Sequence, residues 1–203
     1  MESTQFDPAG LEASLALMPP ATRTLVAEKI SPLVEAKAAI LSHSLSHTEQ
    51  VLKAVAVSDF LAGIILRYPD MVADWLLSER FTRTGHMTKA TLQDDLNELL
   101  KPVHSSEALA KVLREFRRQH MFAIVFRDLV LQESFEVTAR EVSWLAEVCI
   151  DAALDWHEQA LSRQYGYALD SEGNKQRMVI LGMGKLGAEE LNVSSDIDLI
   201  FAY

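Results

Sequence analysis

A change in hydrophobic spacing near residue 177 is the feature that most constrains how this chain can fold. From Leu11 to about Tyr165, apolar residues recur every three or four positions, which is the pattern of amphipathic helices. Residues 166–176 are polar and contain Gly, Asp, Ser and Asn, a composition typical of a linker. The run Met178–Leu181 is short and apolar, and it ends at Gly182, which indicates a buried strand. The sequence therefore predicts a mostly α chain that becomes mixed α/β near its end.

We expect two regions, a helical one over residues 1–170 and the first strand, helix and strand of an α/β core over 177–203. Asp7 before Pro8 suits a helix start, because an Asp side chain caps free N–H groups and Pro fits the first helical position. Thr138-Ala-Arg-Glu141 has the spacing of a capping box and predicts another helix start. Further expected elements are a loop over 79–87, helices over 89–100, 107–132 and 184–191, and a strand over 196–203.

The charge balance and the apolar runs restrict the class of protein. Lys and Arg number 19 against 29 Asp and Glu, which gives a formal net charge of −10. A chain this acidic is a poor general binder of nucleic acid or anionic lipid. The longest apolar runs, Phe60–Leu66 and Met121–Phe126, fall short of the ~20 residues that a membrane helix needs. With no signal peptide visible and a single Cys149, the sequence predicts a cytoplasmic protein.

A glycine-rich run follows the first predicted strand and permits two interpretations. Gly182-Met-Gly184-Lys-Leu-Gly187 is not a P-loop, because Val179 stands where that motif needs Gly and Leu186 where it needs Ser or Thr. The run does match the G-x-G-x-x-G pattern of dinucleotide sites. However, Asp196 and Asp198 precede the second apolar run instead of ending it. A dinucleotide-dependent enzyme stays an alternative.

The second interpretation is a metal-dependent nucleotidyltransferase site. Asp196 and Asp198 are two residues apart, so on a strand both carboxylates would point to one face. Paired carboxylates suit Mg²⁺, which takes a few carboxylates together with phosphate oxygens of the substrate. Gly182 and Gly184 would let the backbone approach a phosphate chain, and Lys185 at the start of the next helix is close by.

The longer run GMGKLGAEELNVSSDIDLIF, residues 182–201, resembles the nucleotidyltransferase motif of bacterial glutamine synthetase adenylyltransferase/adenylyl-removing enzymes. These are large bifunctional proteins of the polymerase-β-like superfamily. Upstream, LREFRRQHMFAIVFRDLV at 113–130 and SWLAEVCIDAAL at 143–154 are similar to the helical part that precedes this motif in the family. The resemblance covers roughly residues 60–203.

The resemblance implies a function and roles for individual residues. The family has two catalytic units, and the position of the motif is similar to that of the N-terminal unit, which removes AMP from a tyrosine of glutamine synthetase by phosphorolysis to ADP. The other unit attaches AMP from ATP. The resemblance implies that Asp196 and Asp198 bind Mg²⁺, and that Gly184 and Lys185 take the place of a phosphate-contacting Gly-Ser pair. Ser195 would help to hold a phosphate. Glutamine synthetase, ATP, ADP, phosphate and a nitrogen-signalling regulatory protein are the implied partners.

One departure from the family pattern concerns the third carboxylate of the superfamily site, which lies on a later strand. This sequence ends at Tyr203, before such a strand, so we expect a truncated core that is inactive alone. Another hypothesis is that the chain is a non-catalytic helical module that binds glutamine synthetase or a signalling protein.

Overall fold

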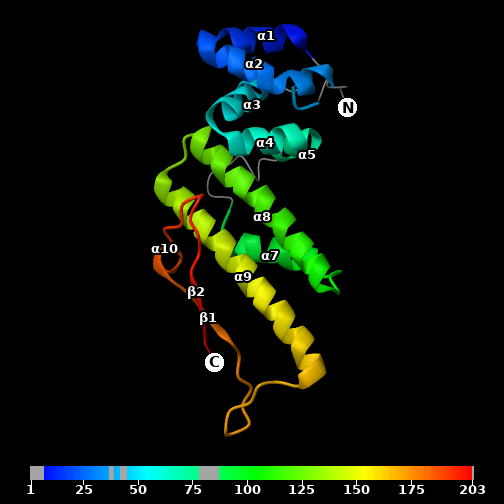
Figure 1. Ribbon diagram of the computed structural model, residues 1–203, viewed down its shortest axis with the longest axis vertical. Coiled ribbons are helices and arrows are strands. Elements are labelled where there is room, and N and C mark those ends of the chain that lie inside the picture. The colour runs from blue at the N-terminus through cyan, green and yellow to red at the C-terminus, as the bar shows by residue number, and fades with distance from the viewer. Residues whose placement is uncertain (1–6, 37–38, 42–44, 78–86, 203) are drawn as a thin grey trace. The chain divides into compact units, whose positions relative to one another are not determined.

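The computed structural model describes residues 7–36, 39–41, 45–77 and 87–202 (Figure 1). The chain is mostly α, with one two-stranded sheet in the described part, as the hydrophobic spacing predicts. It divides into two compact units, residues 1–86 with 122–133, and residues 87–121 with 134–203. The predicted boundary between 170 and 177 stays a prediction; in the structure both strands belong to the second unit.

The first unit is a set of short helices around an apolar core. Asp7 caps the first helix as predicted, because its Oδ1 accepts the N–H of Ala9 at 3.1 Å. The Phe122 ring lies 5.5 Å from Trp75 and 5.7 Å from Phe126, centroid to centroid. The described helices of this unit are α1 (Pro8–Ala16), α2 (Pro20–Glu35), η1 (Ala39–Leu41), α3 (Leu45–Val57), α4 (Asp59–Arg67), α5 (Pro69–Leu77) and the last part of α8 (Ser106–Leu129).

The second unit contains α7 (Lys89–Leu100), the first part of α8 and the long helix α9 (Phe135–Tyr165). The predicted helix over 89–100 is confirmed, and Thr88 caps it through a hydrogen bond from the N–H of Thr91. Helices α7 and α9 pack against each other. The loop predicted over 79–87 lies, apart from its last residue, outside the described residues.

The predicted capping box at residues 138–141 is wrong. Helix α9 begins at Phe135, and Ser134 is its N-cap, with its Oγ accepting the N–H of Val137 at 3.3 Å. Thr138 lies inside the first turns of the helix and is buried there, so it is not at a helix end. Ser and Thr both suit an N-cap, so residue type alone does not distinguish Ser134 from Thr138.

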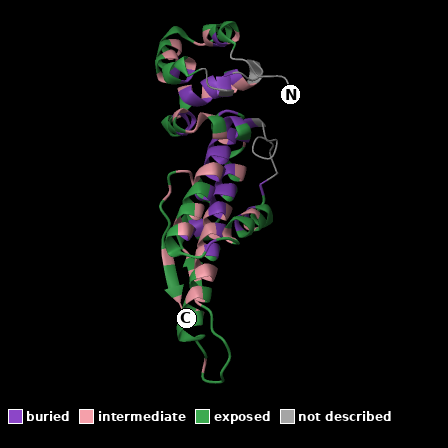
Figure 2. Cartoon of the chain, turned by 90° about the vertical axis from the view of Figure 1, so that its right-hand side faces the viewer, coloured by how far each residue is buried: buried purple, intermediate pink, exposed green. Residues whose placement is uncertain are grey.

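The C-terminal part of the second unit lies along α9 (Figure 1). Strand β1 (Val179–Gly182) pairs antiparallel with β2 (Leu199–Ala202), and the one-turn helix α10 (Gly184–Gly187) follows β1. The predicted helix over 184–191 is thus shorter than expected, and the second strand begins three residues later than predicted. Figure 2 shows that this part is mostly exposed, while purple, buried residues follow the long helices.

The predicted linker after α9 forms an ordered turn in the structure. Leu169 and Lys175 form an antiparallel bridge, and the Asp170 carboxylate accepts the N–H groups of Glu172 and Asn174 at 2.9 and 2.8 Å. Hydrogen bonds from Asn174 are the main reason that the pKa of Asp170 is lowered. In the described part of the chain, no helix is both long enough and apolar enough to span a bilayer.

Candidate functional site

The glycine-rich run forms a tight turn whose glycines are required by packing. Gly184 has φ +56°, a left-handed conformation that favours glycine. A Cβ at Gly182 would lie 2.8 Å from Cγ of the buried Leu186. A Cβ at Gly187 would lie 2.5 Å from the carbonyl oxygen of Gly182. The run therefore folds β1 closely onto α10 with no space for a side chain at either position.

The structure brings the second aspartate beside this turn. The N–H of Met183 donates to the carbonyl oxygen of Asp198 at 2.9 Å, which extends the β1–β2 ladder by one step. Asp196 and Asp198 nevertheless precede β2, which begins at Leu199, so the expectation that they lie on the strand is wrong. We call residues 182–198, from the turn to this pair, the glycine–aspartate segment.

Both aspartate side chains are exposed. Neither has a hydrogen-bond or ion-pair partner within the described residues, so both carboxylates are available to a ligand. The exposed Lys185 likewise has no such partner in the described part of the chain. Helix α10 is a single turn, so it is too short to supply the dipole of a full helix N-terminus.

Asn192 organises the loop between the turn and the aspartates. Its Oδ1 accepts the Ser195 hydroxyl at 2.8 Å and both the N–H and the hydroxyl of Ser194, at 3.1 and 3.2 Å. The Ser195 Oγ also accepts the N–H of Asn192 at 3.2 Å. Ser195 thus shapes the loop, and its contact with a phosphate stays a prediction. Asn192 is not among the site residues that the sequence predicts, although Asn followed closely by Ser is a common turn signal.

A buried hydroxyl on α9 fixes the same loop. Ser143 is fully buried, donates to the carbonyl oxygen of Ala139 at 2.9 Å and accepts the N–H of Leu191 at 3.1 Å. Leu191 is itself buried, at 2% exposure. The glycine–aspartate segment is therefore held to α9 by one backbone hydrogen bond and one apolar side chain at this point. No sequence pattern marks Ser143 for this role.

An ion pair lies beside the turn. The Lys89 ammonium donates to the Glu147 carboxylate at 2.6 Å, which joins the start of α7 to α9. This hydrogen bond is the main reason that the pKa of Lys89 is raised. Burial of the ammonium lowers the pKa, and the negative charges of Glu147, Asp151 and Glu189 raise it further. The pair lines a cavity of about 220 Å³ together with Gly182 and other residues of the turn.

A larger apolar cavity, of about 390 Å³, lies between α8, α9 and residues 191–197. Cys149 lines it, and burial raises the pKa of its thiol to about 11, with a smaller opposing effect from Arg117. The thiol is therefore protonated at neutral pH and is a poor nucleophile. Asp196 lines the edge of this cavity, so the cavity adjoins the aspartate pair.

The donor set of the segment fits Mg²⁺ in part. Mg²⁺ is commonly held by one or two carboxylates, with waters and substrate phosphates completing its shell. Asp196 and Asp198 can supply two carboxylates, but no group of three or more His, Cys, Asp or Glu suited to a metal occurs in the described part of the chain. The remaining ligands would thus have to come from water, substrate or residues outside the described part.

The antiparallel pairing of the two strands contradicts the hypothesis that the glycine run is a dinucleotide-binding site. That fold requires a right-handed crossover between parallel strands, with the glycine run at the first turn. Here the strands on either side of the run are antiparallel neighbours, with Gly182 opposite Leu199. The G-x-G-x-x-G pattern in this chain belongs to a close-packed turn between antiparallel strands.

Comparison with known proteins agrees with the resemblance of the motif. A protein-family model described as glutamate-ammonia ligase adenylyltransferase matches residues 48–203. A "bifunctional glutamine synthetase adenylyltransferase/adenylyl-removing enzyme" of Hahella chejuensis is 44% identical over 193 residues, which is 94% of this chain and 20% of that protein. Proteins of the same name from Shewanella woodyi and Pseudomonas aeruginosa are 39% and 38% identical, over 76% of this chain and 16% of each relative. The chain thus spans about a fifth or less of these relatives, and it belongs to the glutamate-ammonia ligase adenylyltransferase family.

Proposed function

We propose that this chain carries part of a Mg²⁺-dependent nucleotidyltransferase site that removes AMP from glutamine synthetase, in a protein that also attaches AMP from ATP. The names of the relatives support both activities and the partner. We further propose a cytoplasmic location, regulation by a nitrogen-signalling protein, and no activity of these 203 residues alone.

One observation carries the proposal. The hydrogen bond from Met183 N–H to the Asp198 carbonyl oxygen, 2.9 Å long, places the glycine turn directly beside the aspartate pair. A Cβ at Gly184 would meet nothing within 4 Å, so a phosphate group can approach the backbone at this position. Exposed carboxylates beside the turn can share a metal ion with that phosphate. This combination suits transfer of a phosphate-bearing group better than it suits binding of a neutral ligand.

The proposed reaction is an in-line displacement at phosphorus. An oxygen of inorganic phosphate attacks the phosphorus of the AMP group, and the bond from that phosphorus to the tyrosine oxygen breaks. ADP is released, and the tyrosine oxygen takes up a proton. Asp196 and Asp198 would hold Mg²⁺, which when bound stabilises the negative charge that develops in the transition state. The backbone around Gly182 and Gly184, with the Lys185 ammonium and the Ser195 hydroxyl, would orient the phosphates. Asn192 and Ser143 position the loop that carries the aspartates.

The test removes one charge at a time from the aspartate pair. In the full-length protein, Asp196→Asn or Asp198→Asn should lower the rate of phosphate-dependent ADP formation from adenylylated glutamine synthetase by at least about 100-fold. AMP attachment from ATP should stay near normal. Asp170→Asn is the matched control, because Asp170 lies in the turn after α9 and outside the segment. Removal at a near-normal rate in either variant would show that the carboxylate assignment is wrong.

A binding measurement addresses the alternative of a non-catalytic helical module. Calorimetric titration of the 203-residue chain with ADP, with and without Mg²⁺, compares the wild type with Asp198→Asn. Binding that requires both Mg²⁺ and Asp198 would contradict the module hypothesis. Mg²⁺-independent binding, unchanged by the substitution, would contradict a metal site at this residue.

A further inference from the structure

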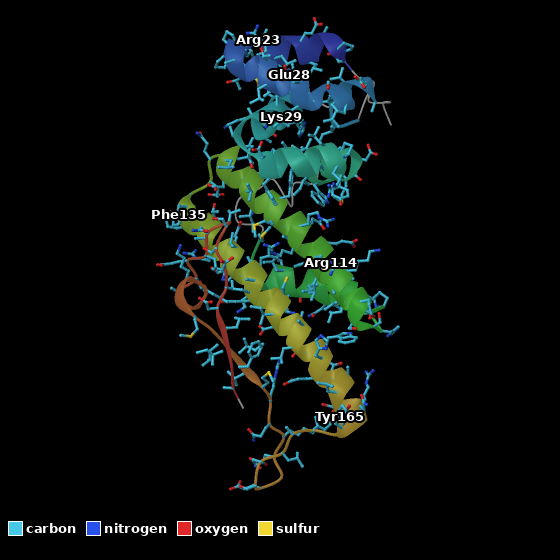
Figure 3. The ribbon with its side chains drawn as sticks, in the orientation of Figure 1. Arg23, Glu28, Lys29, Arg114, Phe135 and Tyr165 are labelled. Atoms are coloured by element: carbon cyan, nitrogen blue, oxygen red, sulfur yellow. The ribbon has the colours of Figure 1, made fainter. Side chains whose placement is uncertain are left out.

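A separate cavity lies in the second unit between the end of α7 and the second half of α9. Its volume is about 540 Å³, and its lining comes from residues 97–104 and 152–163. Cavities that hold small ligands usually have ~300–1,000 Å³, so this one has the size of a small-molecule site. No residue of the glycine–aspartate segment lines it. We call it the α7–α9 cavity; in Figure 3 the label of Tyr165 marks the end of α9 that lies just beyond it.

The lining of the α7–α9 cavity includes more basic side chains than acidic ones. Arg163, Lys101 and His104 all contribute to it, and Asp155 is its one carboxylate. The Asp155 carboxylate pairs with the guanidinium of Arg177, which also pairs with Glu158, so the negative charge of Asp155 is compensated in part. Arg163 has no ion-pair partner among the described residues, and it is exposed. In a chain with a net charge of −10, the guanidinium of Arg163 is thus a local cation that an anion can contact.

Lys101 is the weaker of the two permanent cations. Its ammonium contacts both oxygens of Glu98 at 2.6 Å, but both side chains are about two-thirds exposed. An exposed pair at this spacing contributes little, so an anionic ligand can compete for the ammonium. Arg163 can present a planar, bidentate donor pair to a phosphate without breaking any contact that a described residue makes.

An aromatic ring in the lining is held in one orientation. The indole N–H of Trp156 donates to the carbonyl oxygen of Val103 at 3.3 Å. The ring of His157 meets that of Trp156 edge-on, with centroids 5.0 Å apart and planes at 85°. These contacts fix the half-buried indole beside the cavity before any ligand arrives. A fixed aromatic surface favours stacking of a planar ring, because the indole loses little conformational entropy when the ligand binds.

We propose that the α7–α9 cavity binds a nucleoside monophosphate. The planar base contacts Trp156, and the phosphate contacts Arg163 and Lys101. The amide of Gln159 and the N–H groups of the Asn97 amide, whose Oδ1 already accepts from Gln93 at 3.1 Å, can meet the polar edge of the base. This site is distinct from the proposed catalytic site, since it shares no residue with the glycine–aspartate segment and requires no metal ion.

The experiment is calorimetric titration of the 203-residue chain with AMP in the presence of EDTA. EDTA removes divalent metal ions and so prevents metal-dependent binding at the aspartate pair. Adenosine and inorganic phosphate are titrated separately to distinguish the contributions of ring and anion. Arg163→Ala should weaken AMP binding by about tenfold, the effect expected from loss of one charge-assisted hydrogen-bonding group. Arg114→Ala, an exposed arginine on α8 labelled in Figure 3, is the charge-matched control and should leave binding unchanged.

A second variant tests the ring, and circular dichroism checks that each variant folds. Trp156→Leu should weaken AMP binding severalfold while leaving the weak binding of inorganic phosphate unchanged. Three outcomes would overturn the proposal: no AMP binding by the wild type at millimolar concentration, equal binding by the Arg163 and Arg114 variants, or inorganic phosphate binding as tightly as AMP. Loss of AMP binding in Asp196→Asn but not in Arg163→Ala would also overturn it, because the nucleotide would then lie at the aspartate pair.

Discussion

Helix α9 and the glycine–aspartate segment lie in the same unit, but different interactions hold them in place. Helix α9 buries apolar residues over four of its turns, including Leu145 and Val148 at no more than 1% exposure. In the segment, the buried side chains are Leu186 and Leu191. The rest depends on backbone and loop hydrogen bonds and on glycines that leave no space for a side chain. Stability thus resides mainly in the helix, and the proposed chemistry in the segment that it supports.

The largest loss of stability should come from truncating a buried leucine, and the same truncation in α9 and in the glycine–aspartate segment compares the two. Leu145→Ala on α9 should lower the free energy of unfolding by about 2–5 kcal/mol, since it removes packed atoms from the core. Leu191→Ala should cost less globally, because most of the surrounding segment is exposed and can shift to fill the space. Urea denaturation followed by circular dichroism measures both. Equal losses would show that the segment is as strongly packed as the helix.

A smaller and more local effect is expected from adding one methyl group to the turn. Gly187→Ala places a Cβ 2.5 Å from the Gly182 carbonyl oxygen, so backbone must move, at a cost of about 1–3 kcal/mol. Hydrogen exchange should accelerate at Met183, whose N–H bonds Asp198, while α9 stays protected. Gly63→Ala in α4 is the control, because a Cβ there meets nothing within 4 Å. Unchanged exchange at Met183 would contradict the packing role of Gly187.

Local signals explain how much of the fold could be predicted. The helix over 89–100 has a Thr cap before it and Pro102 after it, and both act within a few residues. The start of α9 is harder to predict, because Ser134 and Thr138 both suit an N-cap, and only the folded chain shows that Thr138 is buried inside the helix. The strand predicted over 196–203 starts too early, since Asp196 and Asp198 lie before β2, which begins at Leu199.

The candidate site likewise combines a feature that neighbouring residues predict with contacts between residues far apart in the sequence. The proximity of the glycine turn and the aspartate pair could be anticipated from one short motif. The supporting residues could not, because the Ser143 contact spans 48 positions and the Lys89 contact spans 58. A lone buried Ser and a lone Lys carry no spacing pattern, so only the folded chain identifies them.

The smallest change in stability is expected for the Lys89–Glu147 ion pair beside the turn. The Lys89 pKa is raised, chiefly by the hydrogen bond from its ammonium to Glu147. The pair therefore stabilises the folded chain fully below the ordinary lysine pKa of about 10.4, and this contribution is lost as the pH rises through the raised value. Lys89 is 49% exposed, so Lys89→Met should lower the free energy of unfolding at pH 8 by no more than about 1 kcal/mol.

Urea denaturation of Lys89→Met and of the wild type across pH 8 to about 11 measures this difference, which should narrow once the pH passes the ordinary lysine pKa. Lys111→Met, an exposed lysine on α8, is the control for loss of a positive charge alone. Glu147→Gln should lose stability similarly at pH 8, and combining it with Lys89→Met should cost less than the sum of the two, because they share one interaction. Additive losses, or a deficit that persists unchanged at high pH, would mean that Lys89 acts through the packing of its hydrocarbon chain. The segment would then depend on α7 through apolar contact instead of charge.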